Sequence, residues 1–350
     1  MRIAIVTDAW LPQTNGVVTT LSRTRECIER AGHDVLLVTP EPFRTFPCPT
    51  YPEIRLAWRP GAEIARRLDR FAPQCIHVAT EGTLGLAARA YCRRRGLEFT
   101  TSYHTRFPRY VRMRAPVPES WSYAYLRWFH GAAMRTMTGT PSQREELLAR
   151  GFRNVTLWSR GVDTALFRPR EKTFGGFIHP VAMYVGRVAV EKNIDAFVTL
   201  EVAGSKVVVG DGPALAALRR RHPDIHFTGY KFGEELASCL AAADVFVFPS
   251  RTDTFGLVML EAMACGVPVA AYPVTGPVDV IDNGVTGMLD VDLSRAARAA
   301  LELDPAACRA QALRHTWEAA TSQFLDNLWP IGAGASSPVS QKFQQSTTKT

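Results

Sequence analysis

The chain has 350 residues, 46% of them hydrophobic and 21% charged, a composition typical of a globular protein. That length exceeds the usual size of a single hydrophobic core, so we expect two domains. No apolar run approaches the roughly 20 residues that a membrane-spanning helix needs, which argues against a transmembrane class.

The first residues lead directly into a predicted strand and lack the cleavage site of a secretory signal. The seven cysteines are scattered, odd in number and without a Cys-x-x-Cys pair. This pattern favours reduced thiols over disulfides or a zinc site, and we expect a cytoplasmic protein without a metal.

Strand and helix patterns alternate in the first half of the chain. The predicted elements are 2–7, 16–31, 34–39, 74–78, 82–95, 98–102, 119–135, 137–140 and 141–150. Such alternation indicates an α/β fold with a parallel sheet. No Gly-x-Gly-x-x-Gly follows the first strand, which disfavours a dinucleotide-binding site.

A hinge is predicted at 154–169, where Gly161 and Pro169 punctuate the chain. A second alternating series follows, at 181–185, 193–200, 205–209, 213–221, 225–228, 233–241 and 244–248. We therefore expect two doubly wound, Rossmann-like domains, at 1–168 and 169–304, that face a central cleft. Residues 305–330 read as helical and 331–350 as a disordered tail.

The two halves differ in charge. Residues 1–168 hold 25 arginines, no lysine and 14 acidic residues, whereas the remainder holds 16 basic and 19 acidic residues. Genomic composition accounts for arginine without lysine. The difference in sign suggests that the first domain faces an anionic partner such as a membrane surface.

The segment 186–192 carries two cations just after a predicted strand. Arg187 and Lys192 at this spacing can bracket a diphosphate, because a guanidinium binds two oxygens and an ammonium acts as a point charge. The alternative is a solvated pair at a helix start. Cations there oppose the helix dipole, so the pattern favours an anion-binding role.

The segment 250–268 follows a short apolar strand. A polar turn leads to a helix predicted to begin near Gly256 and to end at Gly266. A helix start at the carboxyl end of a parallel strand suits a phosphate or a sugar, and Glu261 further along could accept hydrogen bonds from a ribose. An ordinary strand–helix unit with two solvent-facing acids, Asp253 and Glu261, is the alternative.

These residues resemble the signature of the family 4 glycosyltransferases with the GT-B fold: two acids eight positions apart, with Phe255 and Gly256 between them. The first acid is Asp253 instead of the usual glutamate, which leaves the donor sugar open. The resemblance implies that Arg187, Lys192 and the amides of 255–257, including that of Leu257, hold a donor diphosphate. It also implies that Glu261 holds the ribose.

The resemblance assigns further residues. Gly16, which could equally be a turn or N-cap glycine, would approach the donor diphosphate. His104 and Asp253 would orient the sugar, although a lone histidine is more often structural. Tyr230, whose alternative role is packing, would lie near the nucleotide base. The helical segment 305–330 would pack back on the first domain.

The segments 103–110 and 158–167 most resemble the bacterial glycolipid branch of this family. That branch includes diacylglycerol glycosyltransferases, sulfoquinovosyl-diacylglycerol synthases and GDP-mannose-dependent mannosyltransferases. The resemblance implies a retaining hexosyltransferase that uses a UDP- or GDP-linked sugar and no other cofactor. Arg187 and Lys192 would replace a metal, and no Asp-x-Asp stands at a strand end.

The segment 106–114 interleaves arginines with aromatic and aliphatic residues. Such a segment suits a lipid headgroup interface, and a solvated loop is equally compatible with it. RNA binding is the third alternative, but no RNA-binding fold signature accompanies the segment. Because it adjoins His104, we expect a lipid acceptor, no nucleic acid, and peripheral attachment to the inner face of the cytoplasmic membrane. The alternatives are a mannosyltransferase for a soluble or polyprenyl-linked glycan and a catalytically silent nucleotide-sugar-binding protein.

Overall fold

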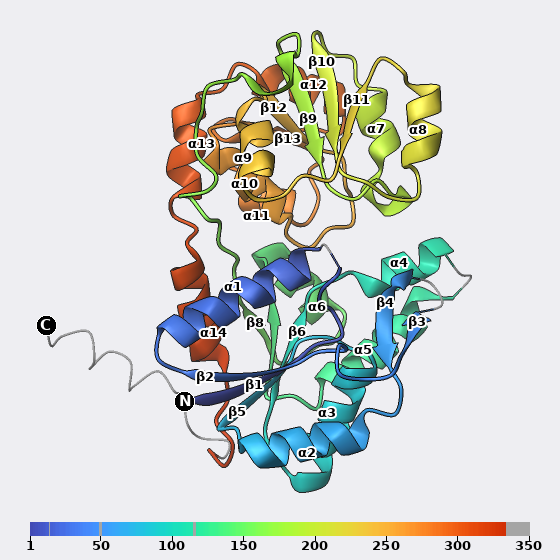
Figure 1. Cartoon of the computed structure of the whole chain (residues 1–350), viewed down its shortest axis with the longest axis vertical. Helices are drawn as coiled ribbons and strands as arrows, with labels where there is room; N and C mark the ends of the chain where they lie inside the picture. Colours follow the sequence, from blue (N-terminus) through green and yellow to red (C-terminus); the bar gives the residue numbers. More distant parts are fainter. Residues whose placement is uncertain (14, 49–50, 115–116, 334–350) are drawn as a thin grey trace, which may run out of the picture. The chain divides into compact units, whose positions relative to one another are not determined.

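The computed structural model describes residues 1–13, 15–48, 51–114 and 117–333, and it divides the chain into two compact units (Figure 1). Unit 1 consists of Met1–Ser159 and the residues from Trp317 on, and unit 2 of Arg160–Thr316. Each unit has its own six-stranded sheet, in which all strands are parallel. The expected pair of doubly wound α/β domains is therefore confirmed.

Unit 1 has the strand order β2-β1-β5-β6-β7-β8 in its main sheet. Its strands are β1 (Arg2–Val6), β2 (Asp34–Val38), β3 (Thr45–Cys48), β4 (Tyr51–Ala57), β5 (Cys75–Val78), β6 (Thr100–Tyr103), β7 (Arg135–Thr138) and β8 (Val155–Leu157). Its helices are α1 (Gly16–Arg30), α2 (Gly61–Phe71), α3 (Thr83–Arg95), α4 (Phe107–Arg114), α5 (Glu119–His130), α6 (Pro141–Ala149) and α14 (Trp317–Asn327).

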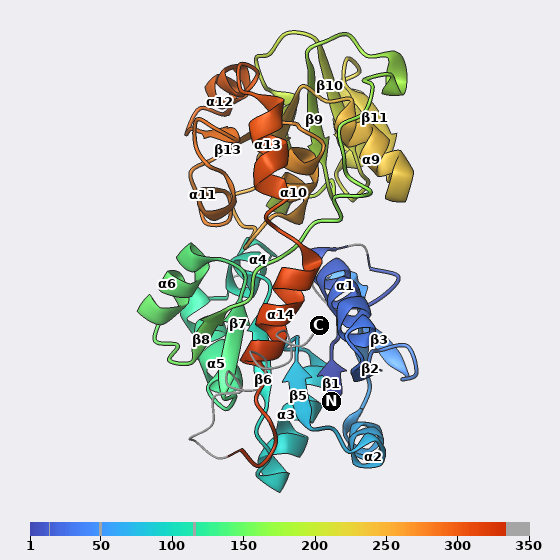
Figure 2. The ribbon, with the colours of Figure 1, turned by 90° about the vertical axis from the view of Figure 1, so that its left-hand side faces the viewer.

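Strand β1 shows how this sheet is covered. Successive side chains of a strand point to opposite faces. Ile3 and Ile5 pack in the cluster that holds residues of α1 and α14, whereas Ala4 and Val6 pack with residues of α2 and α3. Figures 1 and 2 show α1 and α14 side by side on one face of the sheet. Because both faces are buried, β1 reads as a continuous apolar run.

Unit 2 repeats this plan with the order β11-β10-β9-β12-β13-β14. Its strands are β9 (Val181–Val185), β10 (Ser205–Val209), β11 (His226–Gly229), β12 (Val245–Phe248), β13 (Val269–Ala271) and β14 (Gly287–Leu289). Its α-helices are α7 (Ile194–Val198), α8 (Leu215–Arg221), α9 (Gly233–Ala241), α10 (Leu257–Ala264), α11 (Pro277–Val280), α12 (Leu293–Ala300) and α13 (Pro305–Ala312). Short 3-10 turns lie at Phe174–Gly176 and Val190–Lys192.

Strand β9 divides the core of unit 2 in the same way. Val181 and Met183 lie in the cluster with residues of α9, α10 and α13, and Ala182 and Tyr184 lie in the cluster with residues of α7, α8 and α12. All four are at most 1% exposed. The sheet is thus a buried central layer, and its loops at the carboxyl ends of the strands are left to carry polar groups.

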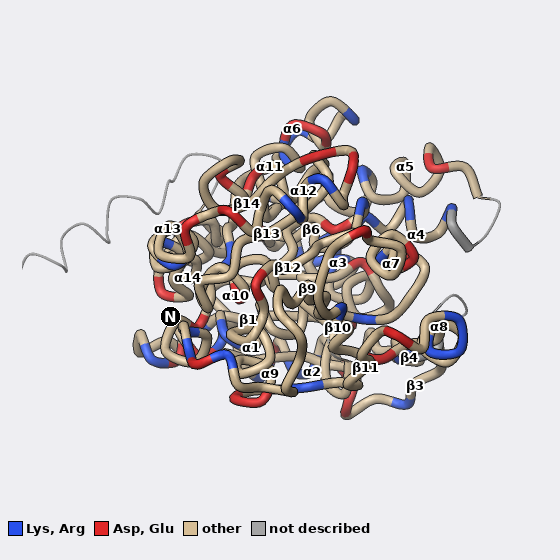
Figure 3. Tube along the Cα trace, turned by 90° about the horizontal axis from the view of Figure 1, so that it is seen from above, with Lys and Arg blue, Asp and Glu red and all other residues tan. Residues whose placement is uncertain are grey.

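Arginines gather at helix C-termini, where positive charge is favourable because the helix dipole ends negative. The last turn of α3 carries Arg93–Arg95 and that of α8 carries Arg219–Arg221. Figure 3 shows the latter run as a blue stretch of the trace. Part of the arginine content of both units therefore has a local structural role.

The final predicted helix is two helices in the structure. Helix α13 belongs to unit 2, where Arg309 on it donates to the carbonyl oxygens of Phe167 and Ala264, at 2.7 Å each. Helix α14 joins unit 1 and buries Phe324 and Leu325 in the cluster of α1. The unit boundaries therefore fall at 159/160 and 316/317 instead of the predicted 168/169 and 304/305.

Five elements of unit 1 have no counterpart among the predicted ones: strands β3 and β4, helices α2 and α4, and strand β8, which lies in the predicted hinge. Helix α4 replaces the loop considered for 106–114. At the other end of the chain, Ile331 donates its backbone N–H to Gln74 and packs on a core cluster. The rest of the predicted tail, 334–350, lies outside the described residues.

The cysteines are free, and six of the seven are buried. Burial raises the pKa of the Cys92 thiol to about 12, so that thiol stays protonated and unreactive at neutral pH. Among the described residues, no helix is both long and apolar enough to cross a membrane.

Candidate functional site

Helix α10 is preceded by a glycine whose backbone conformation would be strained for any other residue. Gly256 precedes the helix with φ of +85°, in the left-handed region. A Cβ there would lie 2.7 Å from Met259 Cε and 2.9 Å from Phe248 Cζ. Phe255 is buried beside it, and Leu257 is the first helical residue, as predicted. Because Gly256 has no side chain, a ligand could approach the backbone amides at the start of α10 closely.

Asp253 forms the closest polar contact of this turn. Its Oδ1 lies 2.5 Å from Lys192 Nζ, and the two side chains are 16% and 23% exposed. The other oxygen, Oδ2, is buried and accepts no hydrogen bond from the described residues. A half-buried carboxylate therefore holds one cation and keeps one oxygen that a ligand hydroxyl could satisfy.

Lys192 and Arg187 come from the loop after β9, the strand that pairs with β12. Tyr184 Oη donates to the carbonyl oxygen of Arg187 at 2.8 Å, and burial raises the pKa of this hydroxyl, so it remains a donor. Arg187 Nη1 lies 4.0 Å from an oxygen of Glu191, which is 3% exposed. Buried groups thus position Arg187.

Two hydrogen bonds fasten this loop to the one that carries Asp253. Thr252 Oγ1 donates to the carbonyl oxygen of Glu191 at 3.0 Å. Asn193, in the left-handed conformation with φ of +53°, donates from Nδ2 to the carbonyl oxygen of Pro249, also at 3.0 Å. The structure therefore brings together Arg187, Lys192, Asp253 and the start of α10.

Sequence reasoning missed Thr252, Asn193 and Gly276. A Cβ at Gly276 would lie 3.3 Å from the carbonyl oxygens of both Asp253 and Phe255, so a side chain there would crowd the turn. The Gly-Pro pair at 276–277 was a turn signal that could have drawn attention to this position. Nothing in the sequence marked Thr252 or Asn193.

Glu261 and Tyr230 are the other two predicted residues of unit 2. Glu261 is half-buried on the second turn of α10. Tyr230 follows the edge strand β11, which β10 separates from β9. It is 42% exposed and stacks on Phe232, with ring centroids 5.8 Å apart. A flat aromatic surface at a strand end is suited to a nucleobase.

In unit 1, Gly16 is the first residue of α1, and Asn15 is the N-cap. Asn15 Oδ1 accepts hydrogen bonds from the amides of Val17 and Val18, at 3.0 and 3.1 Å. The interpretation of Gly16 as an N-cap is therefore wrong. Gly16 is exposed, and it leaves the start of the helix without a side chain.

His104 follows β6, at the carboxyl edge of the unit 1 sheet, as predicted. Its ring meets Trp158 edge to face, with centroids 5.6 Å apart. Trp158 is fully buried in the cluster of α1 and α14. A rigid core residue thus sets the orientation of a half-buried imidazole at a strand end.

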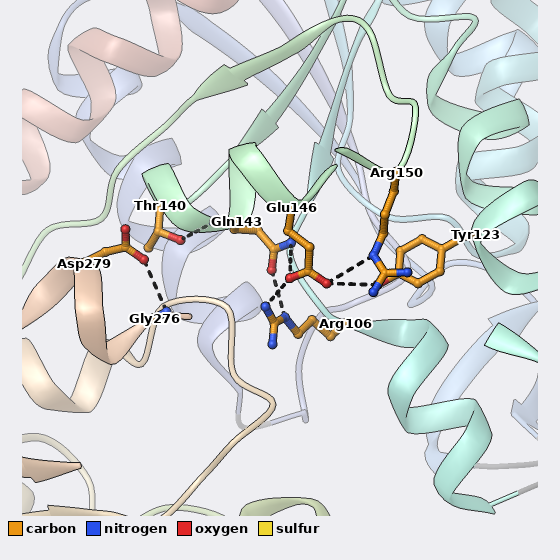
Figure 4. A network of polar contacts seen from close by, with 8 residues as sticks. All are labelled: Arg106, Tyr123, Thr140, Gln143, Glu146, Arg150, Gly276 and Asp279. Atoms are coloured by element: carbon orange, nitrogen blue, oxygen red, sulfur yellow. Dashed lines mark hydrogen bonds and ion pairs between the residues drawn. The ribbon is translucent and has the colours of Figure 1, made fainter. Parts of the chain in front are cut away.

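Arg106 is buried, 2% exposed, and is not available to a lipid surface, contrary to the expectation for 106–114. Its Nε donates to Gln143 Oε1 at 3.1 Å, and its Nη2 forms an ion pair with Glu146 (Figure 4). Arg150 lies 3.3 Å from the other oxygen of Glu146 and stacks over Tyr123. This network ties the loop after His104 to helix α6.

The rest of the segment 106–114 forms α4. Phe107 is 43% exposed, and Arg112 forms a surface ion pair with Glu119 at 3.5 Å. The side chains of Met113 and Arg114 lie outside the described residues. Only part of the predicted basic and aromatic segment is therefore presented to solvent.

The residue types of the unit 2 cluster suit an anionic ligand. Two positioned cations and a helix start suit a group with two negative charges, such as a diphosphate. The neighbouring carboxylates Asp253 and Glu261 suit hydroxyl groups. A phosphorylated sugar compound combines both.

Comparison with known proteins gave matches to two family models. The "Glycosyltransferase Family 4" model matches residues 14–166, and the "Glycosyl transferases group 1" model matches 179–303. The chain is 32% identical to a GDP-mannose-dependent alpha-mannosyltransferase of Mycobacterium tuberculosis, over 83% of each chain. It is 31% identical to the sulfoquinovosyl transferase SQD2 of Arabidopsis thaliana, over 85% of this chain and 67% of that one.

A more distant relative is the alpha-monoglucosyldiacylglycerol synthase of Streptococcus pneumoniae, 27% identical over 78% of this chain and 71% of that one. Among solved structures, the sucrose-phosphate synthase of Thermosynechococcus elongatus is similar with a TM-score of 0.73 and 22% identity. That match covers 92% of this chain and 97% of the other, and it indicates a shared fold.

The Arg106–Glu146 pair should stabilise unit 1. In Glu146→Gln, a buried guanidinium loses its counter-charge, and we expect the free energy of unfolding to fall by about 3 kcal/mol. All seven tryptophans lie in unit 1, so a urea titration followed by tryptophan fluorescence reports on this unit. Glu119→Gln, which breaks the exposed pair with Arg112, is the control and should cost less than about 1 kcal/mol. Equal losses in the two variants would contradict the assignment.

Proposed function

Because the chain belongs to the family 4 glycosyltransferases with the GT-B fold, we propose that it moves a hexosyl group from a nucleotide-diphosphate sugar to a membrane lipid, with diacylglycerol as the expected acceptor. The observation that carries the donor assignment is the cluster of Arg187, Lys192 and Asp253 beside the start of α10. Unit 2 thus binds the donor, and unit 1 binds the acceptor.

Each residue of the donor site has a stated role in this proposal. Arg187, Lys192 and the amides of Phe255–Leu257 hold the diphosphate, to which Gly16 of unit 1 adds a backbone contact. Glu261 accepts hydrogen bonds from the ribose. Asp253 receives a sugar hydroxyl on its unsatisfied oxygen, and His104 of unit 1 orients the same sugar. Tyr230 lies beside the base.

The chemical demand of the reaction is charge on the leaving group. When the bond between the anomeric carbon and the diphosphate breaks, the electron pair stays on the phosphate oxygen, and the two cations stabilise it. The acceptor hydroxyl attacks from the same face, and its proton passes to that oxygen. The configuration is retained, and neither a protein nucleophile nor a metal is required in this scheme.

The lipid acceptor rests on relatives. One relative is named for monoglucosyldiacylglycerol synthesis. The second candidate is a GDP-mannose-dependent mannosyltransferase for a soluble or polyprenyl-linked glycan, which the 32% identical relative favours. The two candidates share the donor site and differ in the sugar and in the need for a lipid surface.

The charge of Lys192 should be needed for donor binding. We expect Lys192→Ala to raise the donor Kd by roughly tenfold or more, because a charge-assisted contact with the diphosphate is lost. Isothermal titration calorimetry with the nucleoside diphosphate measures this.

Lys172→Ala is the matched control, since Lys172 also pairs with an aspartate of unit 2, Asp244, but before the start of β12 instead of after its end. It should change the Kd by less than about twofold. If both variants bind the donor as the native protein does, the anion site has been assigned to the wrong residues.

His104 should matter for transfer more than for donor binding. In His104→Ala we expect kcat to fall by roughly a hundredfold, while the donor Kd changes little, because the imidazole contacts the sugar and not the diphosphate. Steady-state kinetics and calorimetry on the same variant separate the two quantities. An unchanged kcat would remove His104 from the site.

A donor screen tests the proposed function directly. UDP-glucose, UDP-galactose, UDP-glucuronate and GDP-mannose are each incubated with the protein and diacylglycerol in anionic vesicles, and lipid product and released nucleotide are followed. We expect glycolipid from at least one UDP-sugar. Glycolipid from GDP-mannose alone would keep the lipid acceptor and identify mannose as the sugar. Nucleotide release without glycolipid would reject the lipid acceptor and favour the second candidate, and donor binding without turnover would reject the enzyme.

A further inference from the structure

Helix α5 carries large aromatic side chains on both of its faces. Its inner face buries Tyr123, Leu126 and Phe129. Its outer face presents Trp121 and Trp128, which are 72% and 54% exposed. The two indoles are seven positions apart, so they lie on the same side of the helix. A helix with large aromatic side chains on its outer as well as its inner face is unusual at a water-exposed surface and indicates a second apolar environment on the outer side.

The remaining exposed residues of α5 are Ser120, Ala124 and Arg127, and none of them is acidic. Ser120, Trp121, Ala124, Arg127 and Trp128 together span an arc of roughly 120° at 100° per residue, and we call this arc the α5 face. The one carboxylate of the helix, Glu119, is half-buried and pairs with Arg112. The face is therefore aromatic and basic.

A neighbouring arginine holds Trp128 in place. Arg89 of α3 lies over the indole, with its guanidinium carbon 3.7 Å from the ring centroid, and donates from Nη2 to the carbonyl oxygen of Trp128 at 2.8 Å. Helix α4 packs beside α5 and adds the half-exposed Phe107. The Trp128 indole is thus held against α3, with positive charge beside it.

We propose that the α5 face docks the protein on a bilayer of anionic glycerolipids. Indoles suit the membrane–water boundary because they combine an apolar body with a polar N–H, and arginines extend to phosphate groups there. The excess of arginine over acidic residues in residues 1–168 supplies the complementary charge. This inference rests on the proposed function, since diacylglycerol is found in such a bilayer.

The α5 face thereby takes the role that the sequence suggested for 106–114. Arg106 is committed to Glu146 and Gln143 inside the fold. On α4, which packs beside α5, Phe107 remains exposed and Arg112 pairs with Glu119, the first residue of α5. The docking surface is therefore built mainly from α5, with α4 beside it.

The test is vesicle binding of the full-length double variant Trp121→Ala/Trp128→Ala. The native protein should co-sediment with vesicles of phosphatidylglycerol and phosphatidylcholine, and the double variant should partition at least about tenfold more weakly. Trp58→Ala is the matched control, because Trp58 is 59% exposed in the same unit, outside α5, with Phe46 and Arg59 against its ring. It should bind the vesicles as the native protein does.

Two further measurements separate docking from catalysis and folding. Transfer from the donor to diacylglycerol dispersed in detergent should be unchanged in the double variant, whereas transfer in vesicles should fall in proportion to binding. Trp121→Phe/Trp128→Phe should restore most of the vesicle binding. Unchanged partitioning of the double variant overturns the proposal, as does a native protein that ignores anionic vesicles. A native dimer that the double variant converts to a monomer would assign the face to a second copy instead.

Discussion

The ion pair between Lys192 and Asp253 is the interaction around which the proposed donor site of unit 2 is arranged. It joins the loops that follow two adjacent parallel strands, and it is partly withdrawn from water. Such a pair gains little stability, because desolvation offsets much of the attraction, and here one carboxylate oxygen is left without a hydrogen bond. The desolvation of the pair would be offset if a ligand donated a hydrogen bond to that oxygen. The turn at Gly256, the anchor Phe255 and the close approach of Gly276 all keep this carboxylate in place.

The two units differ in which residue types they contain. The lysines in residues 1–333 are all in unit 2, where Lys192 pairs with Asp253 at the site that we propose for the donor diphosphate. All seven tryptophans are in unit 1, where Trp158 orients His104 from the core and Trp121 and Trp128 stand on the surface. Arginine serves both as a buried structural cation, at Arg106, and as a helix-end charge. The role of an arginine in this protein therefore depends on the residues around it.

Much of the fold could be predicted from the sequence, because buried parallel strands read as short apolar runs. Val181–Val185 and Ser205–Val209 were placed to the residue, and the helix after Gly256 began where the glycine indicated. The buried state of Arg106 could not be predicted, since Arg106 lies in a loop and its partner Glu146 is 40 positions away on helix α6. The division of 305–330 was missed because one apolar pattern continues across two helices that pack on different sheets.

Unit 2 is a continuous stretch of chain inserted into unit 1, whose core is closed by α14. Phe324, Leu325 and Leu328 share a cluster with Ile3, Ile5 and Trp158, so the first strand and the last helix are packed together. During synthesis, the whole of unit 2 emerges before the residues that complete the core of unit 1. Domains generally fold as units in the order of their synthesis. We therefore expect the inserted domain to fold first, and unit 1, which takes β1 from before the insertion and α14 from after it, to be completed last.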